Sequence, residues 1–305
     1  MIPLSRRFIT RIHNLYGPGG DDWLTNLPAL RESLLERWAL ENAQPVPEFS
    51  YNFLEFADSP DHGKVVLKIG YPNPELINEI KALEYYRGAA GAVRLLDCDP
   101  DKGALLLERI LPGGNLSSLA DDDQATRIAG ESMLALRQPK PEESEFPTME
   151  KWCQGFTRYQ EWFSDIDGPI PRALFNHAYG IAKELLQSKR NQYLLHGDLH
   201  HTNLLFRYDG TWVAIDPKGV IGEFAFEVGP YLFNPAPHLI RHPDLKGLLQ
   251  RRLQILTEIS GLDRQRLACW SFCRAVLAGI WSVEEGDNHL RYWVKIATVI
   301  RKSVK

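Results

Sequence analysis

The hydrophobic positions in the first 110 residues follow the spacing of short strands and helices. Between Pro28 and Asn42, leucines and a tryptophan recur at helical intervals, which predicts a helix that ends before "QPVP". "EFSYNFLEFA" and "KVVLKI" are rich in aromatic and β-branched residues and predict two strands. "NPELINEIKALEYYRG" predicts a helix with Asn73 as its N-cap and Pro74 in its first position. "VRLLDCDPDKGALLLERI" then predicts two short strands around a turn.

The pattern changes after "LPGGNL", residues 111–116, where helical spacing takes over. Helices are predicted at residues 120–137, 171–190, 244–260, 264–283 and 288–302. One hairpin interrupts them, formed by "NLLFR" and "TWVAID" around the turn residues Asp209 and Gly210. Residues 139–168 mix proline, acidic and aromatic residues and break the helical pattern. We therefore predict a boundary between a first lobe at residues 1–110 and a second at residues 111–305.

Composition narrows the choice of partners. The chain has 35 Lys and Arg against 39 Asp and Glu, so its formal charge of −4 gives no broad attraction to nucleic acid or to an anionic membrane. Its 305 residues are 44% hydrophobic, enough for a sizeable core. No uncharged run of about 18 residues is present to span a bilayer, and the four cysteines form no disulfide framework. We expect a cytoplasmic protein that binds neither nucleic acid nor membrane.

Two charged residues fall where the pattern places them close together. Strand alternation in "VVLKI" puts Lys68 beside Val66, on the face opposite to Val65 and Leu67. A lysine in such a strand is usually a solvated side chain. Glu79, however, falls on the inward apolar face of the following helix, where a carboxylate needs a partner or must reach out to water.

The stretch "HGDLHHTNLLFRYDGTWVAIDPKG", residues 196–219, contains the residue types that phosphoryl transfer requires. The reaction needs a carboxylate that accepts the proton of the acceptor hydroxyl, and oxygen ligands for Mg²⁺. Asp198 precedes Asn203 by five residues in a loop that leads into the hairpin, and Asp216 ends the second strand of that hairpin. Because the two strands are antiparallel, we expect both metal-binding oxygens at the same end. Asp198 is thus predicted to be the catalytic base, with Asn203 and Asp216 as ligands of Mg²⁺.

The same stretch allows a different interpretation, a zinc or dinuclear metal site. His196, Asp198, His200 and His201 are residue types that bind metal in hydrolases. The remaining histidines have no ligand-like spacing, which weakens this hypothesis. In the kinase hypothesis, His196 instead binds backbone groups to hold the loop, and His200 and His201 face solvent or the phosphates.

"HGDLHHTNLL" followed by "AIDPKG" resembles the aminoglycoside phosphotransferase superfamily, and more closely its streptomycin 6-kinase and hydroxyurea kinase branch. The similarity covers most of the chain from about residue 46 onward. It implies an α+β, two-lobed protein-kinase-like fold with ATP in the cleft. The small N-terminal lobe, residues 1–110, would have an antiparallel sheet plus a helix and bind nucleotide. The larger, mostly helical C-terminal lobe, residues 111–305, would hold the catalytic and acceptor-binding residues.

The resemblance also implies individual roles and cofactors. Lys68, paired with Glu79, would contact ATP, while Val66 covers the adenine and backbone groups of Glu108 and Ile110 meet its edge. The cofactors would be ATP and Mg²⁺. The activity would be O-phosphorylation of a small hydroxylated molecule, foremost a cationic aminoglycoside such as streptomycin, as in antibiotic resistance.

Two features depart from the family pattern. The stretch before Lys68 lacks a Gly-rich phosphate loop, and the lone Gly63 does not supply one. "GEFAFE", residues 222–227, stands where many relatives carry an aspartate that supports the loop. Glu227 is the candidate replacement, although its additional methylene moves the carboxylate by more than about 1 Å.

Candidate contacts to the acceptor carry a weaker signal. Trp281 and Glu284 lie at the end of a predicted helix, and Glu161 and Asp165 lie in an acidic and aromatic segment. Carboxylates beside aromatic rings suit a cationic acceptor, but the same residues also fit a solvated helix face. Two other functions stay open, a catalytically silent nucleotide-binding module of the same fold and a His/Asp metallohydrolase.

Overall fold

The structure, a computed structural model, describes residues 4–47, 51–89, 91–142, 145–188 and 190–304. The chain forms two compact units. Unit 1 comprises Met1–Gly88 and Ala92–Gly113, and unit 2 comprises Ala89–Gly91 and Gly114–Lys305. The division expected between residues 110 and 111 lies close to Gly113, where the chain leaves unit 1 for the last time.

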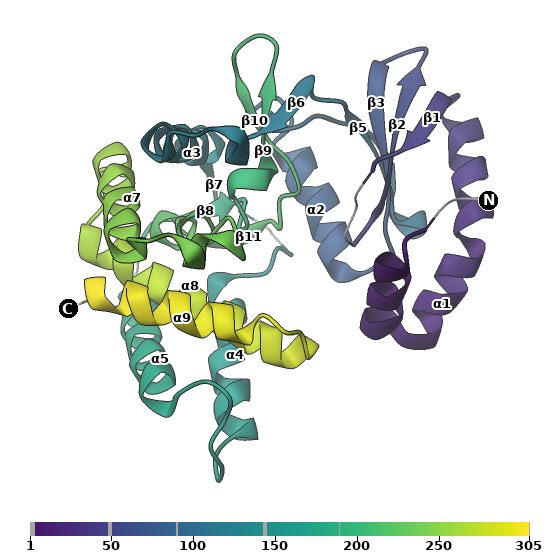
Figure 1. The fold of residues 1–305 in the computed structure, drawn as a ribbon. Coiled ribbons are helices and arrows are strands. Elements are labelled where there is room, and N and C mark those ends of the chain that lie inside the picture. Colours follow the sequence, from purple (N-terminus) through teal and green to yellow (C-terminus); the bar gives the residue numbers. More distant parts are fainter. Residues whose placement is uncertain (1–3, 48–50, 90, 143–144, 189, 305) are drawn as a thin grey trace. The chain divides into compact units, whose positions relative to one another are not determined.

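Unit 1 is an antiparallel sheet with two helices (Figure 1). The strand order is β1-β2-β3-β5-β4, and each neighbouring pair is antiparallel. The strands are β1 (Glu41–Pro45), β2 (Phe53–Ser59), β3 (Gly63–Ile69), β4 (Leu95–Asp99) and β5 (Ala104–Glu108). The helices are α1 (Arg6–Arg37) and α2 (Pro74–Tyr85). Asn73 caps α2 through its side chain and Pro74 opens the helix, as the sequence predicts.

Helix α1 covers one face of this sheet. Val65, Leu67 and Ile69 of β3 are fully buried in one cluster with side chains of α1, which confirms the predicted alternation of the strand. The members that α1 contributes are Phe8, Ile12, Trp23, Leu27 and Leu34. An ion pair adds to this contact, because Arg31 Nε donates to Glu55 Oε2 of β2 at 2.7 Å and Glu55 is fully buried.

Helix α1 and strand β1 differ from the sequence prediction. The helix predicted between Pro28 and Asn42 covers only about the last third of α1, which begins at Arg6 and ends at Arg37. Gly17 takes a non-helical conformation with φ +55°, so two helical segments join at a kink in the "GPGG" sequence. Strand β1 was not predicted because "ENAQP" contains no β-branched residue. Of the strand predicted in "EFSYNFLEFA", β2 begins at Phe53, and residues 48–50 lie outside the described residues.

Unit 2 is mostly helical. Its helices are α3 (Asp122–Leu136), α4 (Met149–Trp162), α5 (Arg172–Gln187), α6 (Gly229–Leu232), α7 (Leu245–Ser260), α8 (Arg264–Glu285) and α9 (Leu290–Ile300). Helix α8 runs through the middle of the unit and packs against α4, α5, α6, α7 and α9 (Figure 1). The five predicted helices are present, whereas α4 was not predicted as an element of its own because it lies in the mixed segment at residues 139–168.

Short strands carry the loops of unit 2. They are β7 (Gln138–Pro139), β8 (Gln192–Leu195), β9 (Leu204–Arg207), β10 (Trp212–Ala214) and β11 (Val220–Glu223). Strand β6 (Pro112–Asn115) contains the boundary after Gly113. The predicted hairpin is β9–β10, with Leu204 opposite Ala214, and β6 adds to its sheet. Strands β8 and β11 pair antiparallel, with Leu195 opposite Val220. The sequence did not predict these two strands, since each has only four residues and adjoins the polar loops.

Helix α8 is long and apolar enough to cross a membrane by length and composition alone. In the structure, 78% of its most apolar stretch is buried among the other helices of unit 2. A buried core helix passes the same test as a membrane span, and this burial makes α8 the core of unit 2.

Candidate active site

The candidate nucleotide-contacting lysine lies in unit 1. Lys68 of β3 points away from α1, and its Nζ lies 2.6 Å from Oε1 and 2.8 Å from Oε2 of Glu79 on α2. Both residues are buried, with 3% and 7% of their surface exposed. A buried ammonium needs a paired anion to be tolerated, so Glu79 fixes both the charge and the direction of Lys68.

The three expected adenine contacts also lie in unit 1. Val66 is half-buried beside Lys68 on β3, and Ile110 is buried just beyond β5. The amide of Glu108 donates to the carbonyl oxygen of Arg94 at 3.0 Å, and the Glu108 carboxylate binds the Arg94 guanidinium. An adenine contact by the Glu108 backbone therefore requires its carbonyl oxygen, and all three contacts remain predictions.

In unit 2, two segments bring the other candidate residues together. The first, residues 196–203, follows β8, and the second, residues 215–219, follows β10. Three backbone-directed hydrogen bonds join them: His196 Nε2 to Ile215 O at 2.9 Å, Lys218 N to His196 O at 2.8 Å, and Ile215 N to Asn203 O at 3.0 Å. We call residues 196–203 the catalytic loop. These bonds place the loop beside the segment that contains Asp216, as the hairpin geometry predicts.

His196 uses both ring nitrogens to hold this arrangement. Its Nε2 donates to Ile215 O, and its Nδ1 accepts from the backbone N–H of Asp198 at 3.3 Å. A ring that donates at one nitrogen and accepts at the other is neutral. Burial is the main reason that the pKa of His196 falls to about 4, so the neutral ring persists at physiological pH. The prediction that His196 holds the loop through backbone groups is confirmed.

Asp198 and Asn203 face different surroundings within the loop. The Asp198 side chain is 35% exposed, whereas Asn203 is buried. Asn203 Nδ2 donates to the Asp198 carbonyl oxygen at 3.0 Å, and this bond orients the amide so that its oxygen is available as a ligand atom. Asp198 thus keeps a carboxylate that solvent and substrate can reach, on a backbone that Asn203 and His196 both hold.

Asp216 has an unusual backbone conformation. Its φ is +58°, in the left-handed region that residues with a side chain seldom adopt and that Asp and Asn tolerate best. Such strained positions concentrate at functional sites. Asp216 and Asn203 together supply a carboxylate and an amide oxygen, the hard ligands that Mg²⁺ prefers, so the donor set fits this ion.

Glu227 binds the backbone of the catalytic loop. Gly197 N lies 3.1 Å from each carboxylate oxygen of Glu227, so the longer side chain does reach the loop as the candidate replacement for aspartate. Glu227 is 2% exposed, and burial raises its pKa to about 7 against the opposing effects of the Gly197 N–H and Arg274. Gly197 itself has φ +81°, and a Cβ there would approach Val220 to 2.9 Å, so only glycine fits.

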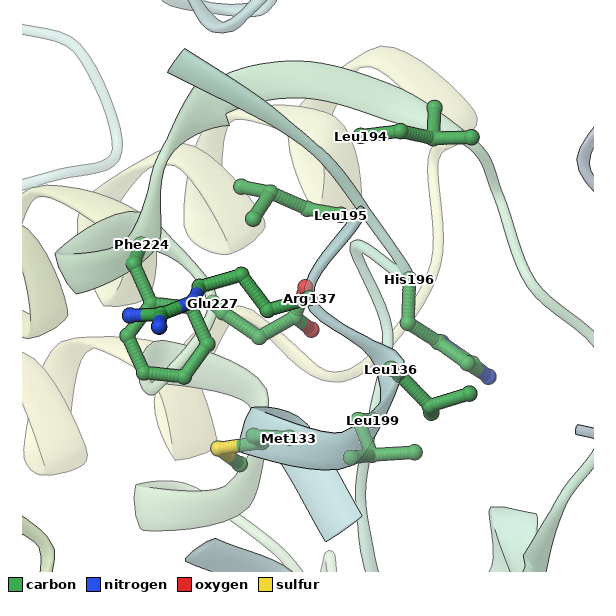
Figure 2. A pocket seen from close by; sticks show the side chains of 9 residues that line it. All are labelled: Met133, Leu136, Arg137, Leu194, Leu195, His196, Leu199, Phe224 and Glu227. Atoms are coloured by element: carbon green, nitrogen blue, oxygen red, sulfur yellow. The ribbon is translucent and has the colours of Figure 1, made fainter. Parts of the chain in front are cut away.

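Burial among apolar side chains explains both pKa shifts. Figure 2 shows His196 and Glu227 lining the same small pocket. Most of the other side chains around it are apolar: Met133, Leu136, Leu194, Leu195, Leu199 and Phe224. Burial removes much of the hydration of the charged forms of both groups, which favours a neutral imidazole and a protonated carboxyl.

His201 does not behave as predicted. It is 3% exposed, and its ring stacks on Tyr231 at a centroid distance of 4.3 Å, whereas we expected it to face solvent or phosphates. Burial lowers its pKa to about 2. The expectation failed because the sequence does not show that Tyr231 and Arg252, both far along the chain, enclose this side chain.

The metal-cage interpretation gains no support from these positions. His196 has both nitrogens engaged and His201 is stacked, which leaves His200 near Asp198, at 3.8 Å between Nε2 and Oδ1. Within the described ranges, no group of three or more His, Cys, Asp and Glu side chains is placed to hold a metal ion. The histidines of the motif therefore shape the loop.

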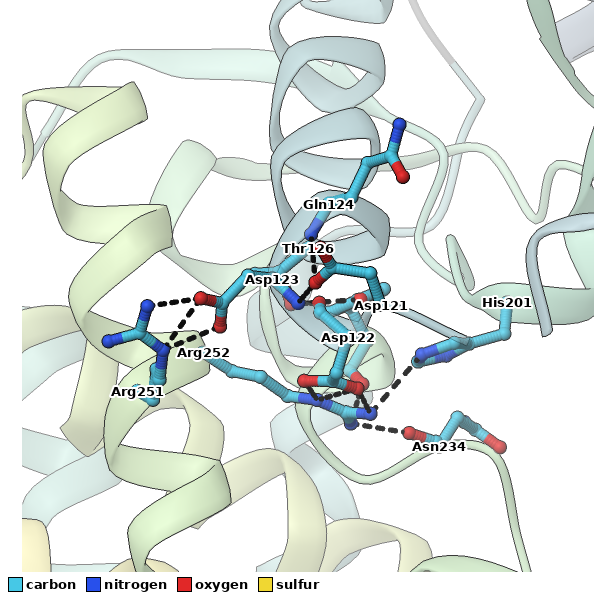
Figure 3. Close-up of polar contacts among 10 residues, drawn as sticks. Asp121, Asp122, Asp123, Gln124, Thr126, His201, Asn234, Arg251 and Arg252 are labelled. Carbon is cyan, nitrogen blue, oxygen red and sulfur yellow. Dashed lines mark hydrogen bonds and ion pairs between the residues drawn. The ribbon is translucent and has the colours of Figure 1, made fainter. Parts of the chain in front are cut away.

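Arg252 of α7 ties the catalytic loop to α3 (Figure 3). Its Nε donates to Asp122 at 2.9 Å, its Nη1 donates to the carbonyl oxygen of Asn234 at 2.7 Å, and its Nη2 lies 3.4 Å from His201 Nε2. Arg252 is 2% exposed. We did not predict this residue, since one arginine in "LLQRRLQIL" carries no sign of a partner about 50 residues earlier.

The expected acceptor contacts are dispersed. Trp281 is half-buried and meets Trp152 edge to face at 5.6 Å, close to the catalytic loop. Glu284 is bound to Arg158 of α4 at 2.8 Å. Glu161 is exposed near the end of α4, about 14 Å along the helix from Trp152 by the rise of 1.5 Å per residue, and Asp165 is exposed beyond the end of the helix. The structure thus brings Trp281 to the loop, and the acceptor roles of all four residues remain predictions.

Comparison with known proteins agrees with this geometry. A family model described as "Aminoglycoside/hydroxyurea antibiotic resistance kinase" matches residues 37–286. The chain belongs to this kinase family. It is therefore a small-molecule phosphotransferase, and the resemblance seen in the sequence is confirmed.

This kinase is similar in sequence to named phosphotransferases and in fold to a solved structure. It is 31% identical to a streptomycin 6-kinase of Streptomyces glaucescens over 278 residues, 90% of this chain and 89% of that one. It is 30% identical to a hydroxyurea phosphotransferase of Kitasatospora aureofaciens over 281 residues, 89% and 77% of the two chains. The crystal structure of the aminoglycoside phosphotransferase APH(4)-Ia has 13% identity, a TM-score of 0.64 and coverage of 91% and 99%. This likeness confirms the predicted α+β, protein-kinase-like fold.

Proposed function

We propose that this kinase transfers the γ-phosphoryl group of ATP to a hydroxyl group of an aminoglycoside, with streptomycin as the first candidate, and that it acts in the cytoplasm. The observation that carries the proposal is the bonding of the catalytic loop. His196 and Asn203 hold the backbone of Asp198 on two sides while its carboxylate stays accessible. A general base needs this combination of fixed direction and access.

Each residue has one task in the proposed reaction. Asp198 accepts the proton of the acceptor hydroxyl as the new P–O bond forms and the bond between the γ-phosphorus and ADP breaks. Lys68, directed by Glu79, contacts the phosphates of ATP and balances their charge. Val66 and the backbone of Glu108 and Ile110 contact the adenine. Asn203 and Asp216 would hold Mg²⁺, which when bound neutralises phosphate charge.

The choice of acceptor rests on the relatives. A streptomycin 6-kinase is 31% identical to this chain over an alignment that covers 90% of this chain. A thermostable mutant of the structural neighbour APH(4)-Ia is known in a ternary complex with ADP and hygromycin B, which supports a nucleotide together with an antibiotic acceptor. Trp281 and Trp152 offer aromatic surface beside the loop, which suits a cationic sugar derivative.

A panel assay tests the proposal. ADP release is measured with streptomycin, other aminoglycosides and hydroxyurea as acceptors, and mass spectrometry identifies the product. We expect a mass gain of one phosphoryl group on streptomycin. Phosphorylation of hydroxyurea alone would replace the acceptor and keep the reaction. ATP binding without transfer to any acceptor would instead establish a silent nucleotide-binding module.

A further inference from the structure

A buried arginine contacts the backbone of the catalytic loop. Arg274 of α8 is 3% exposed, and its Nη2 donates to the carbonyl oxygen of Gly197 at 2.8 Å. Its guanidinium carbon lies 4.5 Å from the ring centre of Phe226, 4.8 Å from that of Trp152 and 5.7 Å from that of Trp281. These three rings form an aromatic cage around the cation.

Arg274 and Glu227 hold the two polar atoms of the same residue. Glu227 accepts from Gly197 N with both carboxylate oxygens, and Arg274 donates to Gly197 O. Gly197 immediately precedes Asp198. We propose that Arg274 is a positioning residue for phosphoryl transfer, which together with Glu227 clamps Gly197 and so fixes the direction of Asp198. The inference deepens the proposed function and rests on Asp198 as the base.

The unsatisfied groups of Arg274 argue against a purely structural role. Within the part of the chain that the structure describes, its Nε and Nη1 have no hydrogen-bond partner. Burial lowers the pKa of Arg274 to about 10, although Asp198 and Glu227 raise it. A buried cation with unpaired N–H groups destabilises the folded state, and an apolar side chain of similar length would avoid this penalty. The charge is therefore explained by its effect on the loop.

Room for the side chain is built into a neighbouring helix. Gly229 begins α6, and a Cβ at that position would lie 2.8 Å from Cβ and 3.0 Å from Cγ of Arg274. This glycine lets the arginine stem pass close to the backbone of α6. The path of the side chain toward Gly197 is thus fixed by packing at its base and by the aromatic cage at its tip.

Two variants of Arg274 and one control test the clamp. Arg274→Met keeps the length and apolar stem but removes the donor and the charge. Arg274→Lys keeps a charge and a donor that can reach Gly197 O. Arg266→Met is the matched control on the same helix, because Arg266 is also poorly exposed but binds Glu223, Ser188 and Leu185 outside the catalytic loop.

Arg274→Met should lower the rate of phosphoryl transfer without lowering the stability of the fold. In Arg274→Met we expect kcat to fall on the order of 100-fold through misdirection of Asp198, with the KM for ATP and acceptor unchanged and Tm not lowered. Arg274→Lys should recover part of kcat. Arg266→Met should lower Tm and leave kcat of the folded protein unchanged. An unchanged kcat in Arg274→Met, a loss of Tm that accounts for its lost activity, or a lysine variant no better than methionine would each overturn the clamp.

Hydrogen–deuterium exchange gives a readout that does not depend on turnover. The peptide that covers the catalytic loop should exchange faster in Arg274→Met than in the parent, and at the parental rate in Arg266→Met. Equal exchange of this peptide in Arg274→Met and the parent refutes the clamp. If the parent transfers phosphate to no acceptor, the proposed function fails, and the exchange measurement still decides whether Arg274 fixes the loop.

Discussion

At the scale of single residues, the catalytic loop combines neutral supports with charged groups nearby. Burial lowers the pKa of His196 to about 4 and raises that of Glu227 to about 7, so both supports are largely uncharged in mildly acidic solution. Arg274, by contrast, stays a cation beneath Asp198 even with its pKa lowered to about 10. Neutral groups hold the backbone without repelling the phosphates, and the charge is concentrated where the proton moves.

The substitution Asp198→Asn tests the base. The amide keeps the size of the side chain but cannot accept the hydroxyl proton, so we expect kcat to fall by about 10²–10⁴-fold. The Kd for MgATP, measured by calorimetry, should stay near the parental value because Asp198 is not among the proposed ligands. Full activity of this variant with a true acceptor would show that another group takes the proton.

The pH dependence of stability tests Glu227. Because its folded pKa of about 7 lies above the ordinary value of 4.5, the unfolded chain loses this proton first as pH rises. The folded protein therefore loses stability between about pH 4.5 and 7, by about 3 kcal/mol in total, and no further above that. Glu227→Gln abolishes this loss, so the Tm of the variant minus that of the parent should rise from pH 5 to pH 8.

Comparing variant and parent cancels the opposite contribution of His196, which stabilises the folded protein less as pH falls below 6.5 toward 4. A Tm difference that stays flat over this range would mean that Glu227 is already ionised in the folded protein at low pH.

Local spacing predicted Asp198, Asn203 and Asp216, because all three belong to one hairpin and its flanking loops. Arg274 and Arg252 were missed, since they reach the loop from helices that follow far along the chain. One signal was available for Arg274: it is the single charge within "LACWSFCRAVLAGIW", a mostly apolar run. A charge in such a buried run needs a partner.

At the scale of elements, β3 and α2 act together through the pair of Lys68 and Glu79. The sequence predicted both elements because strand alternation and the Asn73–Pro74 cap are local signals. The part of α1 before Pro28 escaped prediction because a helix that continues past the Gly17 kink depends on packing against the sheet. Propensity alone favours a break there.

A double-mutant cycle tests the pair. Lys68→Met alone leaves the Glu79 carboxylate buried without its cation, and we expect a loss of about 3–5 kcal/mol in the free energy of unfolding. Lys68→Met combined with Glu79→Leu should recover most of this stability in urea denaturation, since both charges are gone. Both the single and the double variant should have lower activity than the parent, and the KM for ATP should rise in both. Activity restored by the double substitution would show that Lys68 serves structure alone.

At the scale of the whole molecule, ligand binding should appear as stabilisation. A ligand that binds only the folded protein adds about 2.7 kcal/mol at 100 times its Kd. MgATP should therefore raise Tm in the parent and equally in Asp198→Asn, and less in Asp216→Asn, which keeps the left-handed backbone but loses a ligand charge. Equal stabilisation of Asp216→Asn and the parent by MgATP would exclude Asp216 as a ligand.

The match to the kinase family begins at residue 37, the last residue of α1. A chain that began at residue 37 would lack the apolar side chains that bury Val65, Leu67 and Ile69. It would also lack Arg31, which binds the buried carboxylate of Glu55. An apolar sheet face exposed in this way promotes aggregation. A shortened version of this kinase for crystallisation or screening should therefore keep α1, which packs against the strand that carries Lys68.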